Sequence, residues 1–174
     1  IEYGHIDYGE NKVQEAIEKW SDIKINNNKI KLHLVGKLQT NKVKFAVKLF
    51  DFIHSLDSEK LAKKIAEEQN KQNLKPKIFI QINIGNESQK SGILKNNLIE
   101  FYNFSKKLGL NIIGTMCLPP FEEESLKYFS EMNELNQKLK LEEISMGMSS
   151  DYLDAIKFKS TYLRIGTNIF GERN

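Results

Sequence analysis

The sequence has little cysteine and no long apolar run, and each scarcity excludes a class of protein. Cys117 is the only cysteine in 174 residues, so no internal disulfide can form, which fits a reducing cytoplasm. No apolar stretch approaches the roughly 18 residues of a membrane-spanning helix, and no signal peptide or low-complexity tract is visible. We therefore expect a cytoplasmic protein that does not associate with a membrane.

Charge of one sign is not in excess either. The chain has 26 basic and 23 acidic residues, for a net charge of +3, and its lysines are spread among glutamates. No basic cluster is interleaved with aromatic residues, so the pattern indicates solvated helix faces and no nucleic-acid partner. A hydrophobic content of 40% and a charged content of 28% suit a globular domain with a real core.

What the sequence does have is a strict alternation of short apolar runs with helical patterns. The apolar runs predict strands at 5–9, 32–36, 52–57, 78–85, 112–118, 143–148 and 162–166. Helical spacing predicts helices at 10–20, 40–50, 58–72, 95–107, 122–139 and 150–157, and 25–29 is expected to be a simple loop.

This order predicts an α/β fold of the (β/α)₈ TIM-barrel type, with seven of the eight strands present. Alternating strands and helices favour a parallel sheet with crossover helices, and seven strands in a row suit a barrel better than an open sheet. A complete barrel usually needs roughly 200 residues or more. Because the chain is shorter and starts at Ile1 instead of Met, we expect residues 1–174 to form a single barrel domain that is incomplete at its N-terminus.

Several residues carry local helix signals. Thr40 and Ser58 are predicted to cap the helices that follow them, and Gly109 is predicted to end the helix before it. Three glutamates, 122–124, are expected in the first turn of their helix, where they match the helix dipole.

The final strand carries an unusual charge. Arg164 lies inside an apolar strand, two residues before Gly166, and a buried guanidinium needs an acceptor. Barrels often bind phosphate after strands 7 and 8, so Gly166, Thr167 and the neighbouring 145–150 loop (SMGMSS) could form a phosphate cup. Both segments could equally be plain tight turns.

Other polar residues have a structural and a functional interpretation. The three histidines, His5, His33 and His54, lie on separate strands without metal-ligand spacing and are interpreted as structural. Cys117 is expected in the core. Residues 39–42 (QTNK) could contact an anion or simply begin a helix, and Glu10 could be a general base or a partner of a helix dipole. Trp20 is expected to pack.

Six motifs together resemble one known family. They are YGENKVQEA, HLVGKLQTNK, IHSLDS, IQINIGNESQKSG, ISMGMSSDYLDAI and STYLRIGTNIFGER, and they cover about residues 4 to 173. The chain resembles the pyridoxal 5′-phosphate (PLP) homeostasis protein family, the YggS/PROSC group. That family has the PLP-binding barrel shared with the N-terminal domain of alanine racemase.

The resemblance implies PLP as the cofactor and a set of residues that hold it. Arg164 corresponds to the arginine that faces the pyridine nitrogen, and Gly166 and Thr167 correspond to the phosphate-binding pair. The remaining cofactor-binding positions that the resemblance implies are Asn11, Ser145, Met146 and Ser149. No catalytic residue and no metal ligand are expected.

One family feature is missing. The family's Schiff-base lysine lies on the first barrel strand, and no such stretch occurs here, so this lysine is expected upstream of Ile1. Neither Lys37 nor Lys42 is assigned that role.

The resemblance implies a role in vitamin B6 homeostasis without strong catalysis. An arginine at the ring nitrogen keeps that nitrogen unprotonated, which weakens PLP as an electron sink. We expect a monomer that binds PLP and passes it to PLP-dependent apo-enzymes. The alternatives are a PLP-dependent amino-acid racemase-like enzyme of the same fold and a PLP-independent, phosphate-binding barrel enzyme.

Overall fold

A computed structural model describes residues 1–120 and 123–172. Its strands are β1 (Asp7–Glu10), β2 (Lys31–Leu34), β3 (Phe52–Leu56), β4 (Lys77–Ile82), β5 (Asn111–Cys117), β6 (Glu143–Met148) and β7 (Tyr162–Arg164). Its helices are α1 (Val13–Asn26), α2 (Val43–Leu49), α3 (Glu59–Gln72), α4 (Leu98–Lys107), α5 (Ser125–Lys138), α6 (Tyr152–Lys157) and α7 (Thr167–Phe170). Short 3₁₀ turns, Thr40–Lys42 and Lys95–Asn97, lead into α2 and α4.

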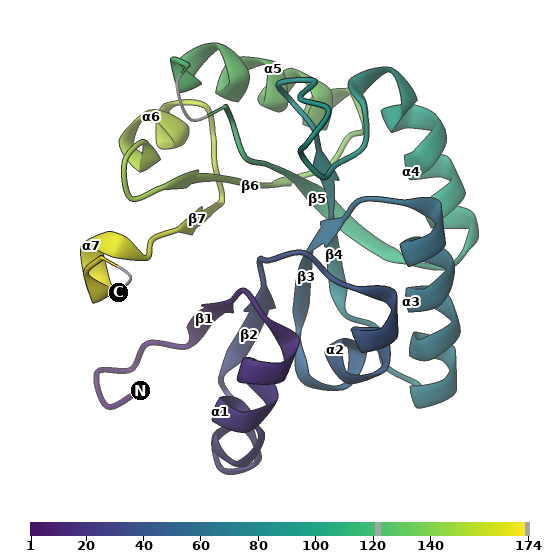
Figure 1. The fold of residues 1–174 in the computed structure, drawn as a ribbon, viewed down its shortest axis with the longest axis vertical. Coiled ribbons are helices and arrows are strands. Elements are labelled where there is room, and N and C mark those ends of the chain that lie inside the picture. Colours follow the sequence, from purple (N-terminus) through teal and green to yellow (C-terminus); the bar gives the residue numbers. More distant parts are fainter. Residues whose placement is uncertain (121–122, 173–174) are drawn as a thin grey trace.

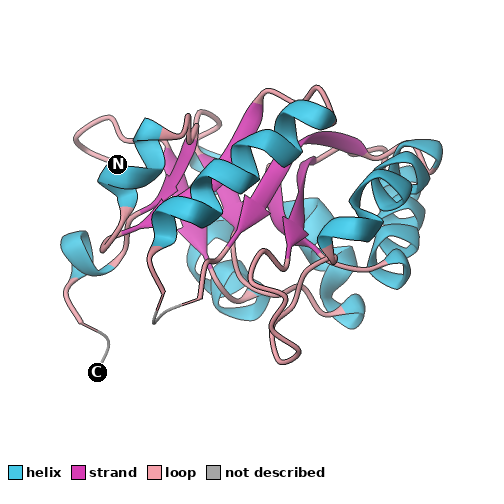
Figure 2. Ribbon diagram, turned by 90° about the horizontal axis from the view of Figure 1, so that it is seen from above, coloured by secondary structure: helices cyan, strands magenta, loops and turns pink. Residues whose placement is uncertain are grey.

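The seven strands form one parallel sheet in the order of the sequence, from β1 to β7. The sheet curls around the centre of the molecule with the helices on its outside (Figure 1). This is the predicted TIM-type barrel with seven strands, nearly closed. β1 and β7 are the two edge strands, and Figures 1 and 2 both show the N-terminal segment and α7 on the same side of the molecule.

Two layers of buried side chains hold the barrel, because successive residues of a strand point to opposite faces. In β4, Ile78, Ile80 and Ile82 belong to the main core between the sheet and the helices. Phe79, between them, points into the barrel and packs with Phe52. Burying each such side chain contributes about 1.5–3 kcal/mol, so the strands are anchored from both faces.

The helix signals of the sequence are partly confirmed. Ser58 caps α3, with its Oγ accepting from the Leu61 N–H at 3.4 Å, and Gly109 follows α4 with φ +75°, a conformation that suits glycine. The prediction for Thr40 is wrong. Thr40 is the first residue of a 3₁₀ turn, its N-cap is Gln39, and no side chain caps that turn.

Three predicted boundaries are also wrong. α1 continues through Asn26, into the segment expected to be a loop. α5 begins at Ser125, so Glu123 and Glu124 precede the helix instead of lying in its first turn, and the prediction for Glu122 falls outside the described residues. β1 begins at Asp7, which leaves His5 before the strand. Propensity places helix ends only approximately, and tertiary contacts decide them.

Candidate functional site

Arg164 ends β7 and is held by acceptors from the two strands before it. Its Nη1 donates to Ser145 Oγ of β6 at 2.7 Å, and its Nη2 donates to the carbonyl oxygen of Cys117, the last residue of β5, at 2.8 Å. None of the ion pairs of the described residues includes Arg164. Burial lowers the pKa of its guanidinium, which nevertheless stays protonated and only donates. A positive charge without a carboxylate partner in the described chain therefore lies at the carboxyl end of the barrel.

The loops after β6 and β7 meet beside this charge, as the sequence predicts. Ser149 Oγ accepts from the backbone N–H groups of Gly166 at 3.2 Å and of Asn168 at 3.3 Å. The Asn168 side chain donates back to the Ser149 carbonyl at 3.1 Å. Gly166 and Thr167 are exposed, and a Cβ on Gly166 would meet no atom within 4 Å. The start of α7 is thus open to solvent and carries backbone donors.

Two predicted site residues lie apart from this group. Met146 is fully buried in the core between sheet and helices, so its side chain faces away from Ser145 and Arg164. Asn11 is exposed after β1, and no described hydrogen bond joins it to Arg164. Its backbone lies against Gly36, where a Cβ would come within 2.1 Å of the Asn11 carbonyl oxygen.

Two histidines inside the barrel contact each other, and this contact was not predicted from the sequence. His33 and His54 are buried and lie 3.0 Å apart between Nδ1 and Nε2, although the sequence suggests no link between them. His33 stacks on Phe52 and His54 stacks on Phe79. Strand alternation could have indicated the contact. His33 pairs in register with Phe52, and His54, two residues after Phe52, points to the same face of the sheet as Phe52.

Burial sets the protonation of these rings. Desolvation lowers the pKa of His33, with Asp7 opposing that shift, and lowers the pKa of His54 further, with His33 and Arg164 adding to it. Both are hydrogen-bonded core side chains, which confirms the structural interpretation for these two. His5 lies outside the strand, in an exposed segment, where its carbonyl accepts from the Tyr8 hydroxyl.

Two further candidates have structural roles. Cys117 is fully buried, and burial raises the pKa of its thiol to about 12, so it is an unreactive core residue as expected. Glu10 has a structural role, and its possible roles as a general base or dipole partner stay predictions. Its Oε1 accepts from Trp20 Nε1 and from Lys19 Nζ, both at 2.7 Å, which ties β1 to α1.

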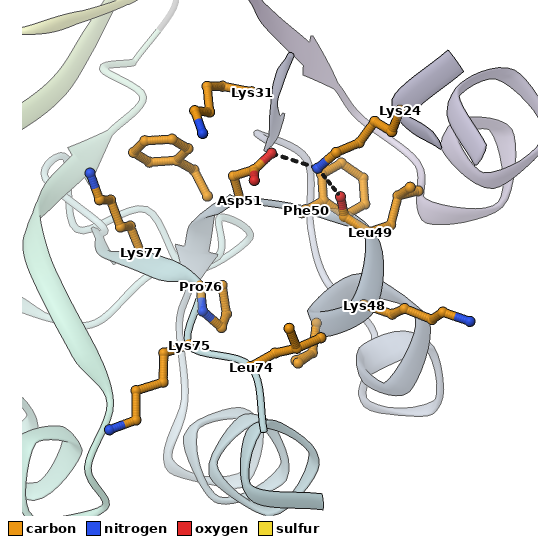
Figure 3. A pocket seen from close by; sticks show the side chains of 12 residues that line it. Lys24, Lys31, Lys48, Leu49, Phe50, Asp51, Leu74, Lys75, Pro76 and Lys77 are labelled. Atoms are coloured by element: carbon orange, nitrogen blue, oxygen red, sulfur yellow. Dashed lines mark hydrogen bonds and ion pairs between the residues drawn. The ribbon is translucent and has the colours of Figure 1, made fainter. Parts of the chain in front are cut away.

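Two hollows of the surface have linings that do not include Arg164. One, of about 280 Å³, lies at the amino ends of β2 to β4 (Figure 3). There Lys24 donates to Asp51 at 2.7 Å, and Lys77 lies 5.1 Å from the centre of the Phe52 ring. Functional groups of such barrels lie at the carboxyl ends of the strands, so we assign this hollow no chemistry.

A second hollow, of about 690 Å³, lies between the 39–42 segment and α3. Two of the lysines that line it pair with glutamates: Lys64 lies 2.9 Å from Glu67, and Lys63 lies 3.7 Å from Glu59. Anion binding by residues 39–42 therefore stays a prediction. In residues 1–120 and 123–172 no cluster of His, Cys, Asp or Glu could hold a metal ion, and no helix is long and apolar enough to cross a membrane.

Comparison with known proteins places the chain in a family. Residues 1–174 match the family model of the alanine racemase N-terminal domain. The chain is 38% identical to the pyridoxal phosphate homeostasis protein of Aquifex aeolicus, over 95% of this chain and 76% of that protein. It is 36% identical to the protein of the same name from Vibrio cholerae, over 96% and 75% of the two chains.

A solved structure agrees. PipY of Synechococcus elongatus, solved with PLP bound, superposes with a TM-score of 0.87 and 32% identity, over 97% of this chain and 82% of PipY. The barrel, the strand order and the sequence motifs all agree with this family. The chain belongs to the pyridoxal phosphate homeostasis protein family, with the fold of the alanine racemase N-terminal domain.

Proposed function

We propose that this protein binds PLP at the carboxyl end of its barrel and serves in vitamin B6 homeostasis, without strong catalysis of its own. The observation that carries the proposal is Arg164, a partly buried guanidinium held by Ser145 and the Cys117 carbonyl. The names of the Aquifex and Vibrio relatives and the PLP-bound PipY structure support it.

The donors around Arg164 fit the two ends of PLP. PLP supplies an aldehyde and a ring that can act as an electron sink. Arg164 would face the ring nitrogen and donate to it. Thr167 would donate its backbone N–H to the phosphate, and Gly166 would do so by exchanging Ser149 Oγ for a phosphate oxygen. Ser149 Oγ accepts from Gly166 and Asn168 and still has its own O–H to donate to the phosphate.

The other two predicted contacts are more restricted. Only the backbone of Met146 is available to a ligand, since its side chain is buried in the core. Asn11 is exposed at the end of β1 and would approach the ring from that side of the barrel.

The same arginine argues against efficient amino-acid chemistry. A guanidinium cannot accept a proton from the pyridinium, so a ring nitrogen that accepts its hydrogen bond stays unprotonated. We therefore propose a carrier that acts as a cytoplasmic monomer and passes PLP to apo-enzymes.

PLP titration of the full-length protein tests the proposal. Arg164→Glu replaces a donor with an acceptor, so the dissociation constant for PLP should rise about 10- to 100-fold, as for a lost charge-assisted hydrogen bond. Lys75→Glu is the control, because it makes the same change of charge on an exposed side chain that lines the hollow at the amino ends of the strands. Equal PLP affinity for wild type and Arg164→Glu would refute the proposal.

Proton exchange at Cα of added amino acids, followed in deuterated solvent, tests the absence of strong catalysis. Wild type should exchange slowly, and Arg164→Glu should exchange faster because a carboxylate favours a protonated ring. Exchange by wild type at about 1–10³ s⁻¹ would favour a racemase-like enzyme. Binding of inorganic phosphate without binding of PLP would favour a PLP-independent barrel enzyme.

A further inference from the structure

A continuous line of hydrogen bonds crosses the barrel interior from β1 to β7. Asp7 Oδ1 lies 3.0 Å from His33 Nε2, and His33 Nδ1 lies 3.0 Å from His54 Nε2. His54 Nδ1 lies 2.8 Å from Ser145 Oγ, which is 2.7 Å from Arg164 Nη1. Five strands each contribute one side chain, and only Asp7 reaches far into solvent, with half of its side chain exposed.

The chemistry of the two ends gives this line one direction. A carboxylate only accepts, so His33 Nε2 carries a proton and donates to Asp7. A neutral imidazole carries one proton, so His33 Nδ1 accepts from His54 Nε2–H. His54 Nδ1 is then an acceptor as well, and the Ser145 hydroxyl donates a hydrogen bond to it. Ser145 in turn accepts from Arg164, which only donates.

The surroundings keep both rings neutral, as this assignment requires. His33 stacks on Phe52 at 4.1 Å and His54 stacks on Phe79 at 4.2 Å, with Tyr162 within 6 Å of both rings. Desolvation lowers the pKa of both imidazoles.

The charged groups around the rings come from several elements. Asp7 and Asp51 favour a charged His33, whereas Lys24 opposes it, and Arg164 opposes a charged His54. A charged His33 would carry a proton on Nδ1, which would then face the Nε2–H of His54. Because two donors cannot bond to each other, His54 would have to change to the Nδ1–H tautomer.

We infer that His33 and His54 are positioning residues: they transmit the acceptor character of Asp7 to Ser145, which is thereby oriented to accept from Arg164 at the ligand end of the barrel. The effect on PLP rests on the proposed function. The direction of the hydrogen bonds does not, because it follows from protein atoms alone.

Nuclear magnetic resonance of the full-length protein with ¹⁵N-labelled histidine tests the direction. His33 and His54 should both be neutral Nε2–H tautomers near neutral pH. Asp7→Ala should let Nδ1–H tautomers appear on both rings. Asp51→Asn is the control, since it removes a charge that acts on His33 through space and leaves the Asp7 contact in place. A wild-type Nδ1–H tautomer at either ring would overturn the inference, and so would Nε2–H tautomers that persist unchanged in Asp7→Ala.

A pair of substitutions at His54 tests the effect on Arg164. The amide of His54→Gln still offers one acceptor and one donor, whereas His54→Phe keeps a stacking ring and leaves Ser145 without its acceptor. The dissociation constant for PLP should rise about fivefold in His54→Phe, as for one lost hydrogen bond, and stay near the wild-type value in His54→Gln.

The outcomes separate the two proposals. Equal PLP affinity in His54→Phe and His54→Gln would refute the positioning role of His54, even if the tautomers are those expected. Wild-type protein that shows the expected tautomers and binds no PLP would refute the proposed function and leave the direction of the line intact.

Discussion

Desolvation governs the ionisable side chains inside this barrel. It lowers the pKa of His33 and His54, raises the pKa of Cys117 to about 12, and lowers the pKa of Arg164. The imidazoles and the thiol are neutral as a result. Arginine alone keeps its charge, because its intrinsic pKa is too high for burial to remove the proton. One group inside the barrel can therefore act as a fixed cation.

The neutral histidines predict a loss of stability in acid. Their folded pKa values lie below the unfolded value of about 6.5, so the unfolded chain binds more protons below that pH. Their contribution is fully present above about pH 6.5 and is lost as the pH falls from there toward the folded pKa values. Each histidine should steepen the fall by up to about 1.4 kcal/mol per pH unit.

Urea unfolding between about pH 8 and pH 5 measures this effect, because carboxylates titrate mainly below this range. His54→Gln should flatten the dependence on pH. His5→Gln, in the exposed N-terminal segment, is the control. An identical dependence in wild type and His54→Gln would show that His54 can be protonated in the folded barrel without cost.

At the scale of single elements, two helix starts that look alike in the sequence differ in the structure. Ser58 caps α3 through the Leu61 N–H, whereas the Thr40 side chain caps nothing. Ser58→Ala should lower the free energy of unfolding by about 1 kcal/mol, and Thr40→Ala should lower it by a few tenths at most. Denaturant melts of the two variants provide the measurement, and equal losses would contradict the assignment.

The strand ends near the candidate site contain two glycines with different constraints. Gly147 has φ +92°, and a Cβ there would lie 2.6 Å from Ala155 Cβ and 3.0 Å from Leu163 Cδ2. Gly147→Ala should therefore cost about 2–3 kcal/mol of stability through strain and overlap.

Gly166→Ala is the matched control for this prediction, because Gly166 has φ −121° and nothing near its Cβ position. Its stability, measured by thermal or urea unfolding, should stay within about 0.5 kcal/mol of wild type. If Gly147→Ala were as stable as Gly166→Ala, the packing of α6 against β6 would be looser than the structure has it.

At the scale of the molecule, the sheet is held unevenly. β4 is paired on both sides, with β3 and β5, and is buried over five of its six residues. β7 has three residues, pairs only with β6, and is not fully buried at any of them. In the described residues, the candidate site therefore lies at an edge strand that is less paired and less buried than the central strands.

Amide hydrogen exchange of the chain of residues 1–174 should reflect this gradient. The amides of β4 and β5 should exchange at least about a hundredfold more slowly than those of β7, because local opening of an edge strand breaks fewer contacts. Bound PLP should slow exchange at β7 and the start of α7 selectively. Uniform protection of all seven strands would contradict the gradient.

The order of the elements, their type and the barrel class were all readable from the sequence. Apolar periodicity is a local property of the chain, and strict alternation of strand and helix leaves few topologies. Arg164, Gly166 and Ser149 were readable as site candidates for a similar reason: the carboxyl ends of parallel strands meet on one face, so loops far apart in the sequence converge.

Which side chains meet was decided only by the tertiary structure. Alternation along a strand puts Ser145 and Met146 on opposite faces, but the sheet decides that Met146 is the one that faces the helices. Register between β2 and β3 likewise decides that His33 and His54 lie 3.0 Å apart. The same holds for Thr40, whose capping depends on a backbone path that tertiary packing sets. Local sequence specifies periodicity and propensity. The partner of a buried polar group depends on the whole fold, since every strand must be in place before its acceptor can be known.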